Sequence, residues 1–163
     1  MGEDRMRRRE DAPAGELDRF DRAILDILAV EGRLPVAALA DRIGLSKSPT
    51  RARMERLRAR GYILGYRAVL DPARMGLEHV AFVEVRLART GEAALEAFNA
   101  AVRRIPEVES CHMIAGAFDY LLKVRTRDIA AYRAILGERI GALPHVASTS
   151  THVAMEAVKE PGA

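Results

Sequence analysis

The spacing of apolar residues predicts helices in the first half of the chain and strands interrupted by helices in the second. Within residues 17–33, apolar side chains recur every three or four positions, as in an amphipathic helix. This stripe consists of Phe20, Ile24, Ile27 and Leu28. Asp18 stands at the expected N-cap, and Gly32 ends the pattern.

Two further helices are predicted in residues 34–60. Pro35 suits the first turn of the earlier one, and Gly44 suits the tight turn between the two. Ser46 is the expected N-cap of the later one. A short helix, a turn of a few residues containing glycine and a second helix form a helix-turn-helix pattern. The β-rich residues 62–72 then predict a short strand or ribbon, where winged modules place their wing.

The second half alternates in the manner of strands. In residues 79–88, one predicted face carries Val80, Phe82 and Glu84, and the other is apolar throughout. Helices are predicted in residues 91–106 and 128–144, a hairpin around Gly116 in residues 108–126, and a final strand in residues 145–155. This β-α-β-β-α-β order is ferredoxin-like, so the predicted class is α+β. The order is shared by many functions and does not by itself assign one.

Composition narrows the class of protein. The chain has 163 residues, of which 49% are hydrophobic and 30% charged, as expected for a globular protein. Its longest apolar runs are much shorter than a bilayer-spanning helix, so we expect no membrane partner. The first residues mix both charge signs and do not resemble a secretory signal. The single cysteine, Cys111, excludes an internal disulfide framework and suits a reducing, cytoplasmic location.

The positive charge is concentrated in one region. Residues 17–70 hold 11 basic and 6 acidic side chains, whereas residues 71–163 hold 11 basic and 12 acidic ones. The densest part is the stretch from Gly44 to Tyr62, where one lysine and five arginines face a single acid, Glu55. The basic first segment suits binding to the phosphates of a nucleic acid, and the nearly neutral second segment is expected to serve another function.

The third helix can be divided by its angular positions at 100° per residue. Thr50, Met54 and Leu57 form the predicted buried stripe, while Ala52 and Glu55 lie on the outer face between two basic flanks. Small residues between basic flanks allow a helix to approach a nucleic-acid groove closely. Because recognition helices read bases mainly through their N-terminal residues, the predicted base contacts are Lys47, Ser48, Thr50 and Arg51. The predicted phosphate contacts are Arg53, Arg56, Arg58 and Arg60.

Other kinds of site are not indicated. The four histidines do not form a compact metal-ligand pattern with Cys111, so no metal site is predicted. Cys111 lies in a predicted strand and is expected to pack there rather than act as a nucleophile. We find no catalytic triad and no phosphate-cradling glycine loop, and therefore predict no catalytic residue.

The chain resembles the Lrp/AsnC, or feast/famine, transcriptional regulators over residues 17 to about 159. The resemblance rests on "LDRFDRAILDILAVEGR", "LADRIGLSKSPTRARMERLRARGYILGYRAVLDP", "FVEV", "VESCHMIAGAFDYLLKVRTRDIAAYR" and "TSTHVAMEAVKE", which occur in the family's order and spacing. Two positions depart from the family. Thr50 and Arg51 replace a common Cys-Leu pair, which bears on the bases read. His152 replaces a common tyrosine, which bears on effector choice.

The resemblance implies an N-terminal winged helix-turn-helix joined to a C-terminal ferredoxin-like βαββαβ domain called RAM. We accordingly divide the chain into a disordered tail (1–16), a helix-turn-helix DNA-binding domain (17–63), a β-ribbon linker (64–77), a RAM effector-binding and oligomerisation domain (78–157) and a tail (158–163). RAM domains of the family pair into dimers, which commonly form octameric rings. We expect a homodimer that assembles further into a tetramer or an octamer.

The family's small effector, usually an amino acid, binds between dimers near the hairpin. The candidate effector residues carried over are His112, Ile114, Ala115, Gly116, Asp119, Tyr120, Thr149 and Thr151. Asp119 could accept from the ammonium, and loop amides around Gly116 could donate to the carboxylate. Alternatively, Gly116 and Asp119 only shape the hairpin, and the two threonines only suit a strand.

The sequence therefore predicts a sequence-specific regulator of transcription that binds double-stranded DNA and responds to a small effector, with proline or leucine ranked first and no other cofactor. The alternative is an enzyme on the same two-domain plan, such as a siroheme decarboxylase. The arginines of residues 51–60 argue against that alternative. A third interpretation, a RAM-type sensor that does not bind DNA, conflicts with the N-terminal module.

Overall fold

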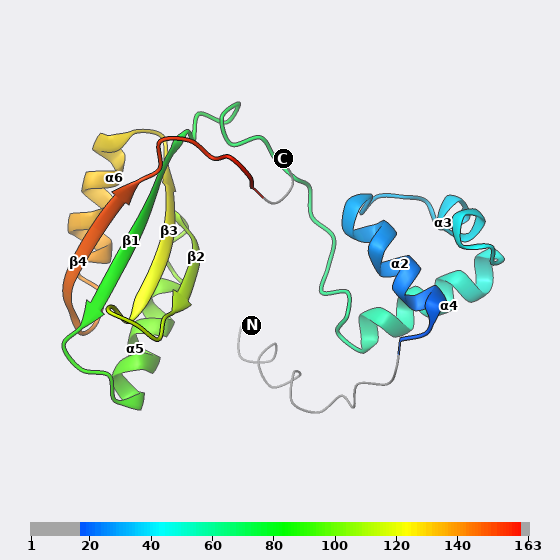
Figure 1. The fold of residues 1–163 in the computed structure, drawn as a ribbon, viewed down its shortest axis with the longest axis horizontal. Helices are drawn as coiled ribbons and strands as arrows, with labels where there is room; N and C mark the ends of the chain where they lie inside the picture. Colours follow the sequence, from blue (N-terminus) through cyan, green and yellow to red (C-terminus); the bar gives the residue numbers. More distant parts are fainter. Residues whose placement is uncertain (1–16, 161–163) are drawn as a thin grey trace. The chain divides into compact units, whose positions relative to one another are not determined.

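The computed structural model describes residues 17–160, and the chain divides between Ala68 and Val69 into two compact units (Figure 1). The tails predicted for residues 1–16 and 161–163 lie outside the described residues. Across the described helices, none combines the length and apolar character that crossing a bilayer demands.

The first unit contains three helices, α2 (Arg19–Val30), α3 (Val36–Ile43) and α4 (Lys47–Ala59). A short turn joins α3 to α4. Asp18 is the N-cap of α2, and its carboxylate accepts from the backbone N–H groups of Phe20 and Asp21. Gly44 ends α3 with a φ of 71°, a conformation that favours glycine. The predicted helix-turn-helix is confirmed, and its core contains Ile24, Leu28, Leu39, Leu57 and Ile63.

Ser46 occupies the predicted N-cap of α4 but makes no side-chain capping bond. Its carbonyl oxygen instead accepts a hydrogen bond from the hydroxyl of Thr50, at 2.9 Å. Thr50 is completely buried. The start of α4 is therefore held from within the module, and the Ser46 side chain is left exposed.

The strand or ribbon expected in residues 62–72 is absent, because the structure contains no strand between α4 and β1 (His79–Leu87). A turn forms there instead, in which the Asp71 carboxylate accepts from the N–H of Ala73. The prediction of a ribbon was wrong for this single chain because a strand exists only when its backbone groups pair with a neighbour. Residues 62–72 have no such neighbour in the described structure, so their β-forming side chains do not form a strand.

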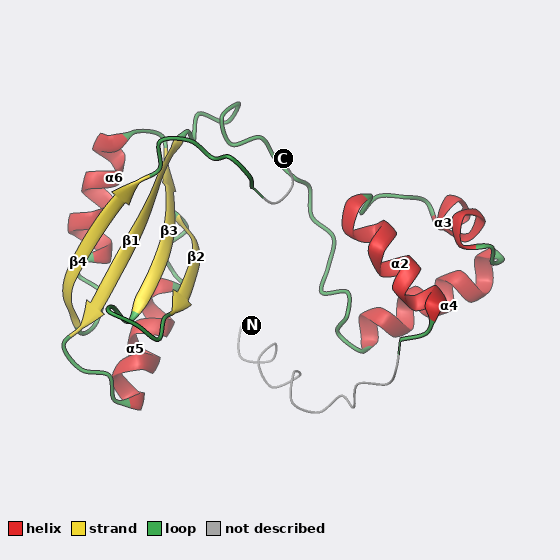
Figure 2. Ribbon diagram, viewed as in Figure 1, coloured by secondary structure: helices red, strands yellow, loops and turns green. Residues whose placement is uncertain are grey.

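The second unit is one antiparallel sheet with two helical segments (Figure 2). Its elements after β1 are α5 (Glu92–Val102), β2 (Val108–Met113), β3 (Tyr120–Thr126), α6 (Ile129–Ile135) with its π-helical extension η1 (Leu136–Ile140), and β4 (Val146–Val153). The strand order β2-β3-β1-β4 and the element order βαββαβ confirm the ferredoxin-like prediction.

The two faces of this sheet differ as the alternation predicted. Ala81, Val83 and Val85 of β1 are completely buried, and they share a core with Phe98 of α5 and Tyr132 of α6. Both helices therefore cover the same face, as Figure 1 shows. The opposite face carries charged groups, where Glu160 from the C-terminal segment contacts Lys123 (2.5 Å) and Arg125 (2.8 Å).

Candidate nucleic-acid interface and effector site

The outward face of α4 forms a continuous polar stripe. Its members are spaced so that they lie within one arc of the helix, and they line a shallow hollow: Lys47, Ser48, Arg51, Ala52 and Glu55. All five are exposed. Lys47 and Arg51 make no ion pair with another residue in the 17–160 range, so their charges are available to a ligand.

Thr50 requires a correction, because it was predicted both for the buried stripe and for base contact. It has no exposed surface, and its hydroxyl donates to the Ser46 carbonyl oxygen. A side chain in this position cannot reach a base edge without opening the module. Only its predicted burial is confirmed.

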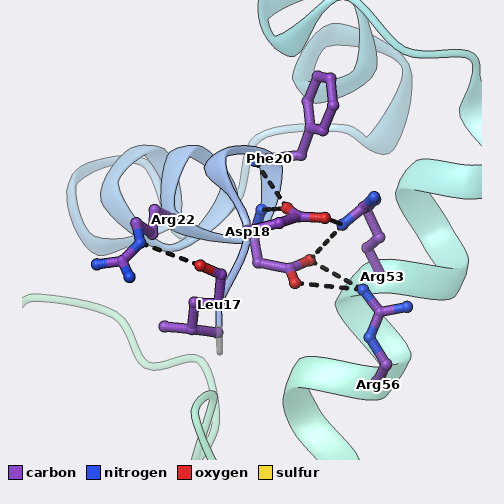
Figure 3. Close-up of polar contacts among 7 residues, drawn as sticks. Leu17, Asp18, Phe20, Arg22, Arg53 and Arg56 are labelled. Carbon is purple, nitrogen blue, oxygen red and sulfur yellow. Dashed lines mark hydrogen bonds and ion pairs between the residues drawn. The ribbon is translucent and has the colours of Figure 1, made fainter. Parts of the chain in front are cut away.

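Arg53 and Arg56 were predicted as phosphate contacts, but they are bound to the start of α2 (Figure 3). Nη1 of Arg53 lies 2.5 Å from a carboxylate oxygen of Asp18 and 2.8 Å from one of Asp21. Nη2 of Arg56 lies 3.0 Å from the same Asp21 oxygen. These contacts pair the two arginines with carboxylates and fasten α4 to α2, which gives them a structural role, and their contact with phosphates stays a prediction.

The electrostatics of this cluster are consistent with its geometry. The Asp21 N–H, with the Arg53 guanidinium, holds the pKa of the Asp18 carboxyl below its ordinary value. Hydrogen bonds to Asp18 and Asp21 raise the pKa of Arg53. The Arg53 guanidinium also lies 5.3 Å from the centre of the Phe20 ring. Asp21 was not among the predicted site residues, and the available signal was an acid one helical turn before the predicted core residue Ile24.

Arg58 and Arg60, at the end of α4, are exposed and make no ion pair with any residue that the structure describes. Their position suits phosphates flanking a groove, as predicted. The charge of α4 is thus divided between two arginines that bind the module and cations that face outward.

The predicted effector residues begin at the hairpin between β2 and β3. His112, Ala115 and Gly116 are exposed there, and Ile114 is half-buried. The Ile114 N–H donates to the carbonyl oxygen of Asp119, at 2.8 Å, which closes the base of the loop. This segment is accessible to a ligand.

Asp119 holds the hairpin against β1. Its carboxylate accepts from the N–H of Leu87 at 2.7 Å, and its own N–H donates to the carbonyl oxygen of Val85 at 2.9 Å. The structure thus shows Asp119 in the alternative role, in which it shapes the hairpin. The carboxylate is half-buried, so an ammonium could still approach it from solvent.

Tyr120 points away from the loop. It is 1% exposed, and its ring lies 4.3 Å from that of Phe98 in the core. A side-chain contact between Tyr120 and an effector is therefore contradicted. The strand alternation could have shown this, because Tyr120 shares its face with Leu122 and Val124, both of which are completely buried.

Thr149 and Thr151 lie on β4, which is separated from β3 by β1. Thr149 pairs with Val85 on one side of β1, and the Asp119 N–H donates to the Val85 carbonyl oxygen on the other, so Asp119 and Thr149 lie about 10 Å apart at the usual strand spacing. Thr151 contacts the hydroxyl of Tyr132 at 2.6 Å. Within one chain, the two threonines therefore lie apart from the hairpin. The predicted effector residues do not line a single pocket.

A second hollow lies between α5 and β2, and Cys111 is one of its lining residues. Burial raises the pKa of the Cys111 thiol to about 11, and the side chain packs against the core. The thiol is thus neutral at physiological pH, as expected for a packing residue. In the described chain, no group of three His, Cys, Asp or Glu side chains could hold a metal ion.

Comparison with known proteins agrees with both units. Residues 17–63 match a family model for winged helix-turn-helix DNA binding, and residues 80–163 match the Lrp/AsnC ligand binding domain. A proline dehydrogenase transcriptional activator of Rhizobium radiobacter is 59% identical over 90% of this chain and 94% of its own. A leucine-responsive regulatory protein of Salmonella typhimurium is 45% identical over 91% and 90%.

Among solved structures, a transcriptional regulator of Neisseria meningitidis in complex with L-Met superimposes with a TM-score of 0.84. The two chains are 32% identical, and the alignment covers 90% of this chain and 95% of the other.

Proposed function

This chain belongs to the Lrp/AsnC family of DNA-binding transcriptional regulators, and from that premise we propose which residues read DNA, what the effector is and how the protein assembles. The chain is a regulator with an amino-acid-binding domain, and not an enzyme of the siroheme decarboxylase kind. Because its ligand is chromosomal DNA, we place it in the cytoplasm.

Base reading is assigned to Lys47, Ser48 and Arg51, and phosphate contact to Arg58 and Arg60. The observation that carries this assignment is the division of charge on α4. Arg53 and Arg56 are neutralised by aspartates, whereas the assigned cations have no ion-pair partner among the described residues. Arginine can bind guanine O6 and N7 through two hydrogen bonds in the major groove.

Fluorescence anisotropy with the protein's own promoter tests this assignment. We expect binding that is tighter for the promoter than for scrambled DNA and that weakens steeply with salt, because phosphate contacts release counterions. Equal affinity for both sequences at every salt concentration would contradict sequence-specific reading.

For the effector, we rank proline or leucine first. Supporting this order, one relative is named as a proline dehydrogenase activator and another as leucine-responsive. A structural neighbour in complex with L-Met supports an amino acid as the class of effector. The accessible hairpin around Gly116, with the Asp119 carboxylate at its base, offers amides for a carboxylate and an acceptor for an ammonium. The hairpin of one chain and the β4 threonines of another would together complete the site.

A thermal-shift screen of the standard amino acids tests the effector, since a ligand that favours the native state raises its melting temperature. Asp119→Asn is the matched variant, because the amide oxygen can still accept from the Leu87 N–H while the negative charge is lost. We expect the variant to melt near the wild type and to lose the ligand's shift. A retained shift would exclude Asp119 from the site.

For assembly, we propose a homodimer that associates into a tetramer or octamer. Five large side chains of the linker are exposed by half or more: Leu64, Tyr66, Val69, Leu70 and Met75. Apolar side chains gathered in an extended segment are typical of an interface. In such a dimer, two copies of α4 would enter major grooves about 34–36 Å apart. An effector that binds one assembly state more tightly would shift the equilibrium toward it.

A further inference from the structure

Glu55 is the only acid on α4 and lies on its outward stripe, next to Arg51 and Ala52 in the same hollow. It is exposed, and it makes no ion pair with any described residue, although Arg51 and Arg58 stand four and three positions away. The other acids near α4, Asp18 and Asp21, are both bound to arginines. Glu55 is thus not explained by the contacts that hold the module together.

A carboxylate on a groove-facing helix has few possible partners. An ionised carboxylate only accepts hydrogen bonds, and DNA phosphates repel it. In the major groove, guanine N7 and O6 and thymine O4 are also acceptors, and donors are offered by cytosine N4 and adenine N6. Glutamate characteristically accepts from cytosine N4. Glu55 therefore favours DNA that places a cytosine amine opposite it and disfavours other sequences.

The position of Glu55 fits this contact. Lys47, Ser48, Arg51, Ala52 and Glu55 are spaced by one, three, one and three residues, so they follow one side of α4 for two turns. Ala52 stands between Arg51 and Glu55, and its small side chain lets the helix backbone approach the bases. Glu55 lies one turn beyond Arg51, and both side chains can reach the edges of neighbouring base pairs.

From this placement we propose that Glu55 is a specificity-determining residue, whose carboxylate accepts a hydrogen bond from the N4 amine of a cytosine in each operator half-site. The proposal rests on the proposed reading of DNA by α4. Glu55 would lower affinity for all DNA through repulsion and would restore it where cytosine is present.

Selection from a random duplex library, with the intact protein, tests the proposal. Glu55→Ala and Glu55→Gln are compared with the wild type and with Asp26→Asn, which removes the same charge from an exposed site on α2. We expect Glu55→Ala to lose about tenfold in discrimination at one position per half-site, where the wild type selects cytosine, and Glu55→Gln to lose less, because its amide oxygen can still accept from the cytosine amine. Affinity for non-cognate DNA should rise in both. Asp26→Asn should keep the wild-type motif.

A modified duplex then tests the contact directly. N4-methylcytosine at that position keeps Watson–Crick pairing but places a methyl group in the major groove, where the carboxylate would bind. It should weaken wild-type binding about tenfold and leave Glu55→Ala unchanged.

The outcomes separate this inference from the function on which it rests. A wild-type protein that selects no motif would refute the reading of DNA by α4, and the role of Glu55 with it. A clear wild-type motif that both Glu55 variants retain would refute the role of Glu55 alone. So would a change confined to a position where the wild type prefers another base.

Discussion

The arginines of α4 differ in function because they differ in their neighbours, and not in their residue type. Arg53 and Arg56 bind Asp18 and Asp21 across 32 to 35 residues of sequence. Arg51 and Arg58 face outward from the same helix. Counting charges along the sequence could not distinguish the paired arginines from the exposed ones. Their different effects on DNA binding can be tested with single substitutions.

Arg51→Ala is expected to lose discrimination by about 1–3 kcal/mol at one base pair, since a base-reading contact is removed. Arg58→Ala is expected to weaken binding to all sequences alike and to reduce the slope of log affinity against log salt by about 1. Anisotropy titrations of both variants with cognate and scrambled DNA measure the difference. Identical behaviour of the two variants would show that this division of α4 is wrong.

Asp21→Ala is expected to lower the free energy of unfolding by about 1–3 kcal/mol. Asp21 is 4% exposed and binds both Arg53 and Arg56, so its loss leaves Arg56 without its carboxylate partner and leaves Arg53 with Asp18 alone. Urea unfolding measures the change, and Asp26→Ala on the exposed side of α2 is the control. Equal stability of the two variants would show that the cluster contributes nothing to the fold.

At the scale of elements, the start of α2 depends on the ionisation of its N-cap. The Asp21 N–H and the Arg53 guanidinium lower the pKa of Asp18 from 3.8 in the folded state. A lowered folded pKa gives stability that is present above the unfolded pKa and is lost as the pH falls through the folded one.

Asp18→Asn is therefore expected to be less stable than the wild type at pH 7, and the difference should shrink below about pH 4. Asparagine can still cap the helix but carries no charge for Arg53. Urea unfolding at a series of pH values from 7 to 3 follows the difference. A gap between the two proteins that stays constant over this range would contradict the charge effect.

The elements themselves were predictable wherever their pattern is local. The stripe of α2 and the alternation of β1 determine which side chains are buried, because helices and strands repeat at 3.6 and 2 residues. The ribbon in residues 62–72 was not predictable in this way. β-forming residues show that a strand can form, but the strand also needs a pairing partner, and residues 17–160 provide none.

At the scale of the whole molecule, assembly is expected to depend on the exposed linker. Replacing Val69 and Leu70 together with aspartate should raise the dissociation constant of the dimer by about 100-fold or more, because burial of each side chain is worth about 1.5–3 kcal/mol. Light scattering after size-exclusion chromatography measures the mass. Val30→Asp, at an exposed apolar position on α2, should remain assembled.

The same double variant should bind a duplex with two half-sites about as weakly as a duplex with one. Dimerisation joins two recognition helices and so makes the second contact effectively intramolecular. A variant that remains a dimer, or that keeps the preference for two half-sites, would show that the linker is not the interface.

By itself, the sequence determined the two kinds of unit, their order and the sidedness of α4, since each follows from residues a few positions apart. Tertiary structure alone decided which charges are free. Asp21 becomes a partner for Arg53 and Arg56, and Asp119 a partner for the Leu87 N–H, only after folding brings together segments more than 30 residues apart. On α4, two arginines therefore bind aspartates of the same module, and other charges lie on the exposed stripe. Glu55 lies on this stripe and makes no ion pair with any described residue.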